Sequence, residues 1–540
     1  MERTDSNRLV GDQRISATAS AWRPLRGQTF RNLLLADIFS DVGTFMQSVG
    51  AAWLMVSLKA GPMYVALTQT ASALPFFLFA LPAGALGDIV DRRKLILWTE
   101  IWMASVAIAL AALVIMGLIS PWLLLALTFA ISAGDAFETP TWRAVLPELV
   151  AKEDFEAASA LNGIEFNLAR AIGPGLAGLL IASFGVGTAF VVNALSFIGV
   201  IYVVARWKRP HRNQIAPAEK VIGATIAALR YVRYSTSVRS LIIRSGAVMF
   251  FASALLALLP TVAHNVSKSP IAFGVLLGCF GTGAVLGAFV LQKARARWST
   301  ETVASSGVII VGVATLATGY LRELPTLSAV MLIGGAAWIT FISLVSALVQ
   351  KLAPDWVRAR VLAVSMLVFQ GGLAAGSATW GIIGEHSGIS TSLLWAGLGA
   401  IATSALGLIW KLPDTTVDVT PWNHWRMPVI PDGLELALES GPVLVTVEYV
   451  VNREHASDFL KAMHRYARVR RRDGASRWAI YRDTEHPDVY LETFVVHSWA
   501  EHLRQHERIT HADRALEERV GSYTSKEQKV RHLVYAMPKR

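Results

Sequence analysis

The sequence predicts an all-α polytopic membrane protein with twelve transmembrane helices in two six-helix parallel repeats, followed by a small C-terminal α+β domain. Of its 540 residues, 53% are hydrophobic and only 16% are charged, whereas soluble domains carry about 25% charged residues. The apolar residues lie in runs of about 20, the length that a helix needs to cross a bilayer. After Trp410 the composition changes abruptly. A single large soluble core and a disordered chain are therefore both excluded.

The N-terminal residues are polar and charged without an apolar centre, which predicts a cytoplasmic tail and no cleaved signal peptide. Twelve apolar segments follow. They are Asn32–Leu58, Met63–Gly87, Leu95–Gly117, Pro121–Thr141, Ala158–Phe184, Gly187–Trp207, Leu241–Ala263, Ile271–Leu291, Thr302–Tyr320, Thr326–Leu348, Val361–Glu385 and Ser390–Trp410. The predicted divisions are an N-terminal tail (1–29), an N-terminal six-helix half (30–207), a basic cytoplasmic loop with an amphipathic helix (208–240), a C-terminal six-helix half (241–411), a linker rich in proline and tryptophan (412–440) and a soluble domain (441–540).

Lysine and arginine gather in alternate loops. The loop between the sixth and seventh segments is rich in both, whereas the loops on the opposite side offer only Lys59, Lys268 and Arg322. The positive-inside rule then puts the basic loops and both termini in the cytoplasm. The net charge of +11 therefore indicates topology, and we expect the lipid bilayer, not a nucleic acid, as a partner.

An internal repeat relates the two halves. The stretches Leu149–Gly185 and Leu352–Gly388 align without gaps. The matched glycines, each pair 203 residues apart, are Gly173 with Gly376, Gly178 with Gly381, and Gly185 with Gly388. Small residues at such spacing let helix backbones approach closely. Two six-helix halves in the same orientation, joined by a cytoplasmic loop, are the parallel repeat of many transporters.

Two motifs point to a family. The loop after the second segment reads Gly84-Ala-Leu-Gly-Asp88-Ile-Val-Asp91-Arg92-Arg93, and the fifth segment contains Gly173-Pro174-Gly175-Leu-Ala-Gly178. The first resembles the Gly-x-Leu-x-Asp-Arg-x-Gly-Arg-Lys loop of the major facilitator superfamily, with Asp88 and Arg92 at matched positions and Asp91 in place of the glycine. The second is similar to the Gly-Pro-x-x-Gly-Gly element typical of its exporters.

A narrower branch is indicated by 147–150, 160–162, 167–174 and 369–372. These stretches resemble the branch that includes the enterobactin exporter and other transmembrane secretion effectors, over about residues 28–412. The resemblance implies a secondary transporter of the bacterial inner membrane that exports a small amphipathic molecule, siderophore-like or toxic, by alternating access. No Gly-Lys dipeptide occurs, so a phosphate-binding loop is excluded. We expect a proton gradient as the energy source and no cofactor.

Ionisable residues within the apolar segments are candidates for the transport site, because each costs roughly 2.5–3.5 kcal/mol at mid-membrane. Asp37 and Asp41 lie one helical turn apart on the same face. Two carboxylates so close favour a shared proton at neutral pH. We expect Asp41, with Asp37, to carry the proton or a cationic substrate. The alternative is that Asp37 lies among the headgroups and Asp41 is a hydrogen-bonded packing residue.

The fourth segment contributes Asp135 and Glu138, and the fifth contributes Glu165 and Arg170. These segments form an antiparallel hairpin, so an acid on one can neutralise Arg170 on the other. Together with Asp88 and Arg92 at the cytoplasmic ends, they predict a charge latch that stabilises one closed state. The alternative is that the same charges form a binding site.

The region after 440 alternates strand and helix patterns. Strands are predicted at 443–451, 476–482, 489–496 and 531–537, and amphipathic helices at 454–472 and 499–508. The order βαββαβ is the ferredoxin-like pattern. With the motifs around Glu492 and Trp499, it resembles the dimeric α+β barrels of the antibiotic-biosynthesis-monooxygenase type, which implies a possible homodimer. We favour a dimerisation or regulatory module over an enzyme.

His502 and His506 are one turn apart on the last predicted helix, with His497 and His511 nearby. Together with Glu492 they are weak candidates for a zinc or haem site. The alternative, which we favour here, is that they face solvent and bind no metal.

Two other functions remain open. The soluble domain could be an enzyme or sensor that acts on the transported compound. Alternatively, the chain could be an importer, because Ala177 stands where the exporter element has the first of its two glycines.

Overall fold

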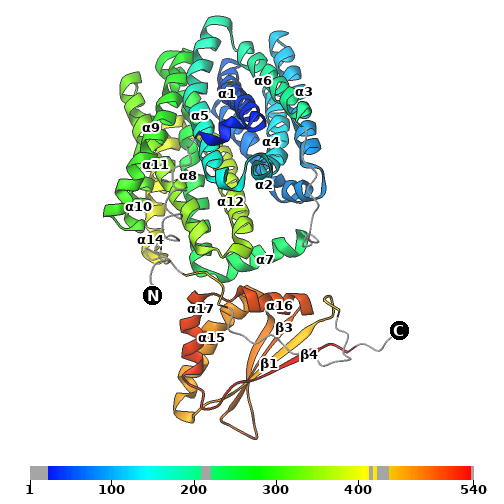
Figure 1. The fold of residues 1–540 in the computed structure, drawn as a ribbon. Helices are drawn as coiled ribbons and strands as arrows, with labels where there is room; N and C mark the ends of the chain where they lie inside the picture. Colours follow the sequence, from blue (N-terminus) through cyan, green and yellow to red (C-terminus); the bar gives the residue numbers. More distant parts are fainter. Residues whose placement is uncertain (1–21, 208–220, 413–417, 423–436, 537–540) are drawn as a thin grey trace, which may run out of the picture.

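The computed structural model describes residues 22–207, 221–412, 418–422 and 437–536. Within these ranges it contains two groups of six long helices, a helix that lies crosswise beneath them, and a small domain with an antiparallel sheet (Figure 1). The first group comprises α1 (Gln28–Ser57), α2 (Pro62–Ile89), α3 (Arg92–Ile115), α4 (Pro121–Leu149), α5 (Phe155–Phe184) and α6 (Gly187–Arg206). The crosswise helix is α7 (Val221–Tyr234). The second group comprises α8 (Thr236–Ser267), α9 (Pro270–Arg297), α10 (Thr300–Tyr320), α11 (Leu324–Leu352), α12 (Asp355–Ser387) and α13 (Ile389–Ser404), which continues as the short α14 (Leu406–Ile409).

Eleven helices in the described ranges are long and apolar enough to cross a membrane. The remaining long helix, α1, has 30 residues and packs along α5 and α6. Its lower apolarity follows from Asp37, Asp41 and several small or amide side chains among its apolar residues. The predicted all-α polytopic architecture is confirmed.

Proline and glycine define several helix ends. Pro62, Pro121 and Pro270 stand in the first turn of α2, α4 and α9, where the missing N–H would have no helical partner in any case. Gly185 ends α5 with φ +88°, and Gly388 ends α12 with φ +89°. Residues with a side chain rarely adopt this conformation. The fifth helix of each half therefore ends in the same way.

The parallel repeat is also confirmed by contacts. The first three helices of the two halves start 208 residues apart (236 − 28, for example), and the fourth helices start 203 apart (324 − 121). A Cβ on Gly178 would lie 3.2 Å from the Cα of Gly274, on α9. A Cβ on Gly381 would lie 2.5 Å from the Cβ of Ala66, on α2. Since Ala66 and Gly274 are themselves 208 apart, each fifth helix crosses the second helix of the other half at an equivalent place.

The two halves are joined at one end of the bundle. We call the end with the α1–α2, α5–α6 and α12–α13 turns the far side, and the end with α7 and the small domain the tail side (Figure 1). Met63 N donates to Glu385 Oε2 at 3.3 Å, and Thr70 Oγ1 donates to the carbonyl of Ala374 at 3.0 Å. Within the described residues, all hydrogen bonds and close glycine contacts between the halves lie between the far side and the middle of the membrane helices.

The small domain, hereafter the tail domain, lies against α7 on the tail side (Figure 1). Its elements are β1 (Val443–Val450), α15 (Ala456–Asp473), β2 (Ser476–Arg482), β3 (Val489–Val496), α16 (Trp499–Arg508), α17 (His511–Gly521) and β4 (Lys529–Val534). The strand order is β2-β3-β1-β4, with antiparallel pairs throughout. The predicted alternation of strands and helices is confirmed. Helix α17 was not predicted, because charged residues dominate its sequence and leave little apolar periodicity.

Candidate functional site

Acidic side chains from four helices of the first half gather between its middle and the tail side. They are Asp37 and Asp41 on α1, Glu100 on α3, Asp135 and Glu138 on α4, and Glu165 on α5. We call this set the carboxyl cluster. Glu100 was not among the predicted residues, although a single acid inside an apolar segment was visible in the sequence. The structure adds it because α3 packs against α4.

Two carboxyl pairs form the cluster's closest contacts. Asp41 and Glu165 are hydrogen-bonding neighbours across α1 and α5, and Glu100 and Glu138 are hydrogen-bonding neighbours across α3 and α4. Two carboxyl groups can share a hydrogen bond only when one of them holds a proton. Glu100 and Glu165 are both buried. Each pair is therefore a place where a proton can reside within the helical bundle.

Hydroxyl groups and one indole support the remaining acids. Thr99 Oγ1 donates to Glu138 Oε2 at 3.0 Å, and Thr139 Oγ1 donates to Asp135 Oδ1 at 2.9 Å. The Trp142 side chain hydrogen-bonds to Asp37. These contacts orient the carboxyl groups but bring no positive charge to them.

Arg170 lies beside the Asp41–Glu165 pair, on α5. Its guanidinium carbon is 4.8 Å from the ring centroid of Phe166 and 6.0 Å from that of Phe45, so its charge faces aromatic rings. Asp41 is the acid whose charge acts on it. Within the described residues, no ion pair joins Arg170 to Asp135 or Glu138. The expected pairing with the acids of the fourth segment is therefore wrong, because Arg170 turns from α4 toward α1.

At the tail side, Arg92 contacts the end of α4. Its Nη1 donates to Glu148 Oε1 and to the carbonyl of Ala144, both at 2.8 Å. Asp88 lies on the last turn of α2, but its side chain falls outside the described residues. The ion pair that the structure contains here is Arg92 with Glu148, which the sequence analysis did not name.

The glycine–proline motif forms the crossing of α5 with two other helices. A Cβ on Gly173 would lie 3.3 Å from the carbonyl oxygen of Val42, on α1. The carbonyl oxygen of Pro174 would lie 2.7 Å from a Cβ on Gly274, and Gly178 approaches the same residue. These residues thus let α5 approach α1 in its own half and α9 in the other half.

A cavity of about 680 Å³ opens at the tail side of the second half. It is lined by one face of α11 from Ile342 to Lys351 and by Arg358 at the start of α12. Two serines and one glutamine alternate there with small apolar residues, and both charged lining residues are basic. The cavity can therefore accept a partly polar molecule, and an anionic group would meet positive charge at its rim.

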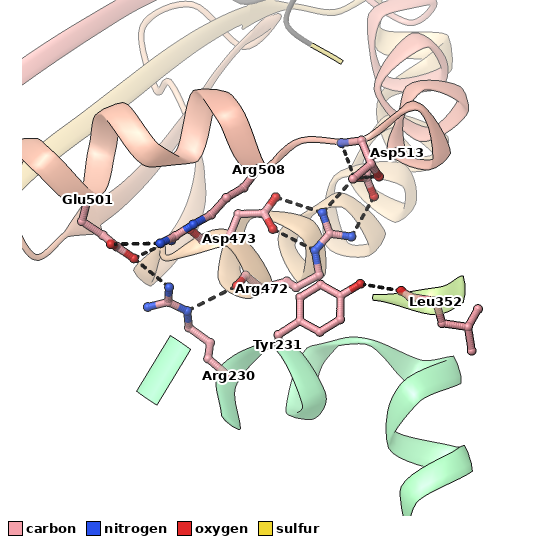
Figure 2. A network of polar contacts seen from close by, with 9 residues as sticks. Arg230, Tyr231, Leu352, Arg472, Asp473, Glu501, Arg508 and Asp513 are labelled. Atoms are coloured by element: carbon pink, nitrogen blue, oxygen red, sulfur yellow. Dashed lines mark hydrogen bonds and ion pairs between the residues drawn. The ribbon is translucent and has the colours of Figure 1, made fainter. Parts of the chain in front are cut away.

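The tail domain contacts the membrane helices through a network of charged residues (Figure 2). Glu501 on α16 accepts hydrogen bonds from Arg230 Nη2 on α7, at 2.8 Å, and from Arg508 Nη1, at 2.6 Å. Burial alone would raise the pKa of Glu501, but the hydrogen bonds and charges of Arg508 and Arg230 outweigh it and lower the pKa. The guanidinium of Arg508 also lies 4.4 Å from the ring of Trp356, on α12.

Tyr231 on α7 lies at the centre of this network (Figure 2). Its hydroxyl donates to the carbonyl of Leu352, at the end of α11, at 2.9 Å, and burial raises its pKa to about 12. Arg472 on α15 lies over the tyrosine ring at 5.6 Å and makes bidentate contacts with Asp473 and Asp513. The tail domain is thus attached to the connector α7 and to the α11–α12 turn at once.

The tail histidines do not lie as the sequence analysis favoured. His502 and His506 are buried, with 3% and 8% of their surface exposed, and they face the interior of the domain. Glu492 does not belong to their group of possible ligands, and Tyr449, Arg470 and Trp478 hydrogen-bond to its two oxygens. The third member of the histidine group is His532, on β4.

Comparison with known proteins gives the family. Residues 19–539 match the transmembrane secretion effector family. The multidrug efflux pump Tap of Mycolicibacterium fortuitum is 24% identical over 65% of this chain and 87% of its own. The staphyloferrin A transporter of Staphylococcus aureus is 23% identical over 67% of this chain and 90% of its own. The enterobactin exporter EntS of Salmonella typhimurium is 26% identical over 70% of this chain and 91% of its own.

Solved structures agree in fold. The nucleoside transporter NupG superposes with a TM-score of 0.61 at 12% identity, over 71% of this chain and all of that chain. A bacterial homologue of the human lysosomal transporter Spinster superposes with a TM-score of 0.56 at 16% identity, over 72% and 95%. The chain therefore belongs to the transmembrane secretion effector family of the major facilitator superfamily, and it is a multi-pass membrane transporter.

Proposed function

We propose that the protein is a proton-coupled exporter of a small amphipathic molecule, siderophore-like or toxic, located in the bacterial inner membrane. The observation that carries the proposal is the Asp41–Glu165 carboxyl pair beside Arg170. Six ionised carboxylates within a bundle interior would repel one another strongly, so the cluster must hold protons. Protons held there can be exchanged when water reaches the cluster from one side or the other.

The tail side is the cytoplasmic side in this proposal, with both termini in the cytoplasm. The turns and connector on that side carry basic residues such as Arg92, Arg93 and Arg239, in line with the positive-inside rule. Because the hydrogen bonds and close glycine contacts between the halves lie toward the far side, we take the tail side as the open side, which faces the cytoplasm. A substrate enters from there, and the cavity along α11 is a candidate part of its path.

The transport cycle follows from these assignments. With the tail side open, the Asp41–Glu165 pair releases its proton to the cytoplasm and Arg170 balances the charge that remains. Substrate binding favours closure of the tail side and separation of the far-side contacts at Gly178 and Gly381. In the far-open state the pair takes up an external proton and substrate leaves. Protonation then removes the attraction to Arg170 and favours return to the tail-open state.

Export is favoured over import by the relatives, because Tap and EntS are named as an efflux pump and an exporter. The direct test compares small molecules in the medium and inside cells that carry the intact gene, a deletion, or Asp41→Asn. A compound should disappear from the medium and accumulate inside in both altered strains, by about 10-fold or more. Asp154→Asn is the matched control, because Asp154 pairs with Arg23 in the turn before α5 and lies outside the carboxyl cluster.

Other outcomes would change the proposal. If an external solute ceases to enter the deletion strain, the protein is an importer. If Asp41→Asn exports normally in everted vesicles and remains dependent on the pH gradient, Asp41 does not couple protons.

We also propose that the tail domain is a dimerisation or regulatory module. Its contacts with α7 and with Trp356 at the start of α12 support a regulatory role, since α7 connects the two halves and the start of α12 borders the α11 cavity. Exposed Tyr481 and Leu533 on the outer strands provide apolar surface for a second copy. Light scattering of the full chain in detergent, with and without Leu533→Glu, tests the dimer. A monomer in both cases rejects it.

A further inference from the structure

Three imidazole side chains converge in the tail domain, far from the carboxyl cluster. His502 and His506 lie one turn apart on the inner face of α16, and His532 comes from β4. One possible ligand nitrogen from each lies within 4.8 Å of the other two. The ring centroids of His502 and His532 are 4.7 Å apart, and Trp499 packs against both rings. The elements that hold these rings belong to the domain's sheet and its main helix layer, so the group is part of a rigid framework.

The spacing of the nitrogens fits a tetrahedral metal ion. Nε2 of His506 lies 3.4 Å from Nε2 of His502. A tetrahedral zinc ion with bonds of about 2.0–2.1 Å holds its nitrogen ligands about 3.3–3.4 Å apart. The ligand nitrogen of His532 lies within 4.8 Å of the other two.

Hydrogen bonding prepares His502 as a ligand. Its Nδ1 lies 3.2 Å from Oε1 of Gln505, which is itself buried. An amide oxygen can only accept, so Nδ1 carries the hydrogen and Nε2 keeps its lone pair. Metal-bound histidines regularly donate their second N–H to such a partner. The neutral ring is the form that binds metal.

The ligand set selects the type of ion. Three neutral imidazoles suit zinc and its neighbours among the first-row transition metals, whereas magnesium and calcium prefer carboxylate and carbonyl oxygens. Glu492, the carboxylate that the sequence suggested as a further ligand, forms an ion pair with Arg470. We propose that His502, His506 and His532 form a binding site for one divalent transition metal ion of the zinc type in the tail domain.

Metal binding there would act on the docking network described above. Glu501 and His502 are adjacent on α16, with Glu501 bound to Arg230 of α7. An ion bound by His502, His506 and His532 would link α16 to β4. The site would thereby connect metal availability to the transporter's connector.

The experiment uses the full chain in detergent, with any polyhistidine tag removed and metals stripped by a chelator. Cobalt(II) is added as a spectroscopic probe, and zinc is then used to displace it. We expect one ion per chain, visible absorption typical of tetrahedral cobalt, displacement by zinc and none by magnesium. His506→Ala and His532→Gln should each weaken cobalt binding at least about 100-fold. His497→Ala is the control, because His497 is exposed on the same domain, and it should bind as the unaltered protein does.

Retention of metal by both site variants would overturn the proposal, as would octahedral cobalt spectra or binding that His497→Ala removes equally. Circular dichroism of the metal-free variants shows whether the domain has kept its fold. If His506→Ala unfolds, the cobalt affinity of His532→Gln tests the proposal, since glutamine keeps a polar side chain of similar size. Absence of binding in the unaltered chain also overturns the proposal.

Discussion

The two halves of the membrane domain have the same helix arrangement, but the buried acids of the first half have uncharged residues at the equivalent positions of the second. At a separation of 208 residues in the first three helices, Asp41 corresponds to Met249 and Glu100 to Val308. At a separation of 203 in the fourth and fifth helices, Glu138 corresponds to Phe341 and Glu165 to Val368. Every member of the carboxyl cluster is therefore matched by an uncharged residue.

A buried ion pair in the second half serves a different purpose. Arg244 binds Glu301 through two hydrogen bonds of 2.7 and 2.8 Å. The same pair also binds the carbonyl of Trp410 and the N–H of Leu412, so it fastens the end of the last membrane helix. The same helix arrangement can therefore hold titratable groups in one half and a packed apolar core in the other.

The largest expected difference is between substitutions at equivalent positions of the two halves. Glu165→Gln should reduce proton-coupled export by about 30-fold, because the pair with Asp41 can no longer take up and release its proton. Val368→Gln places the same side chain at the equivalent site of the second half and should leave export within about threefold. Export from everted vesicles under a fixed pH gradient measures both. Equal losses would mean that the two halves do not differ in function.

The next effect concerns a feature that the halves share. Gly178→Leu and Gly381→Leu should each disfavour the far-closed state by about 1–3 kcal/mol through overpacking, which shifts the conformational equilibrium about 10-fold. The shift is measured as the labelling rate of a cysteine introduced at the far side, in a Cys279→Ala background that removes the native cysteine. Gly199→Leu is the control, because a Cβ there meets nothing within 4 Å. If only one of the two variants opens the far side, the pseudosymmetric crossings are not equivalent.

A smaller change in transport is expected from the ion pair of the second half. Arg244→Gln should lower the free energy of unfolding by about 2 kcal/mol, because Glu301 loses its buried partner. Thermal unfolding in detergent should occur a few degrees lower, while export per folded molecule stays within about twofold. Arg239→Gln, at an exposed residue, should change neither quantity. Loss of proton coupling in Arg244→Gln would assign a transport role to the second half.

The smallest effect lies at the attachment of the tail domain. Tyr231→Phe removes the hydrogen bond that joins α7, to which the tail domain is attached, to the carbonyl of Leu352 on α11 and should weaken that contact by about 1 kcal/mol. Hydrogen exchange of α15 and α7 should increase, with export changed less than about twofold. Unchanged exchange would show that the charged contacts of Arg230 and Arg472 suffice for docking.

Much of the fold followed from local pattern. Each predicted apolar segment coincides with one long helix, although α4 ends eight residues later and α8 and α12 start five and six residues earlier than predicted, and strands β2 and β3 have the predicted bounds. Their signals are strong because membrane spans and amphipathic strands each impose a periodic demand on the sequence. Helix α17 was not predicted, because its mostly charged sequence has little apolar periodicity. Glu100 was missed for another reason, since a single acid shows no partner until α3 and α4 are packed together.

Sequence alone determined the family, the number of halves, the orientation of the repeat and the presence of Asp37 and Asp41 within an apolar segment. Tertiary structure decided which charges meet: Asp41 with Glu165, Arg170 with aromatic rings, Arg92 with Glu148, and His532 with the two histidines of α16. The physical reason is range. Hydropathy and helix periodicity depend on residues that are neighbours in the chain. Ion pairs and metal-ligand sets depend on how distant helices and strands pack, and local sequence patterns do not predict that packing.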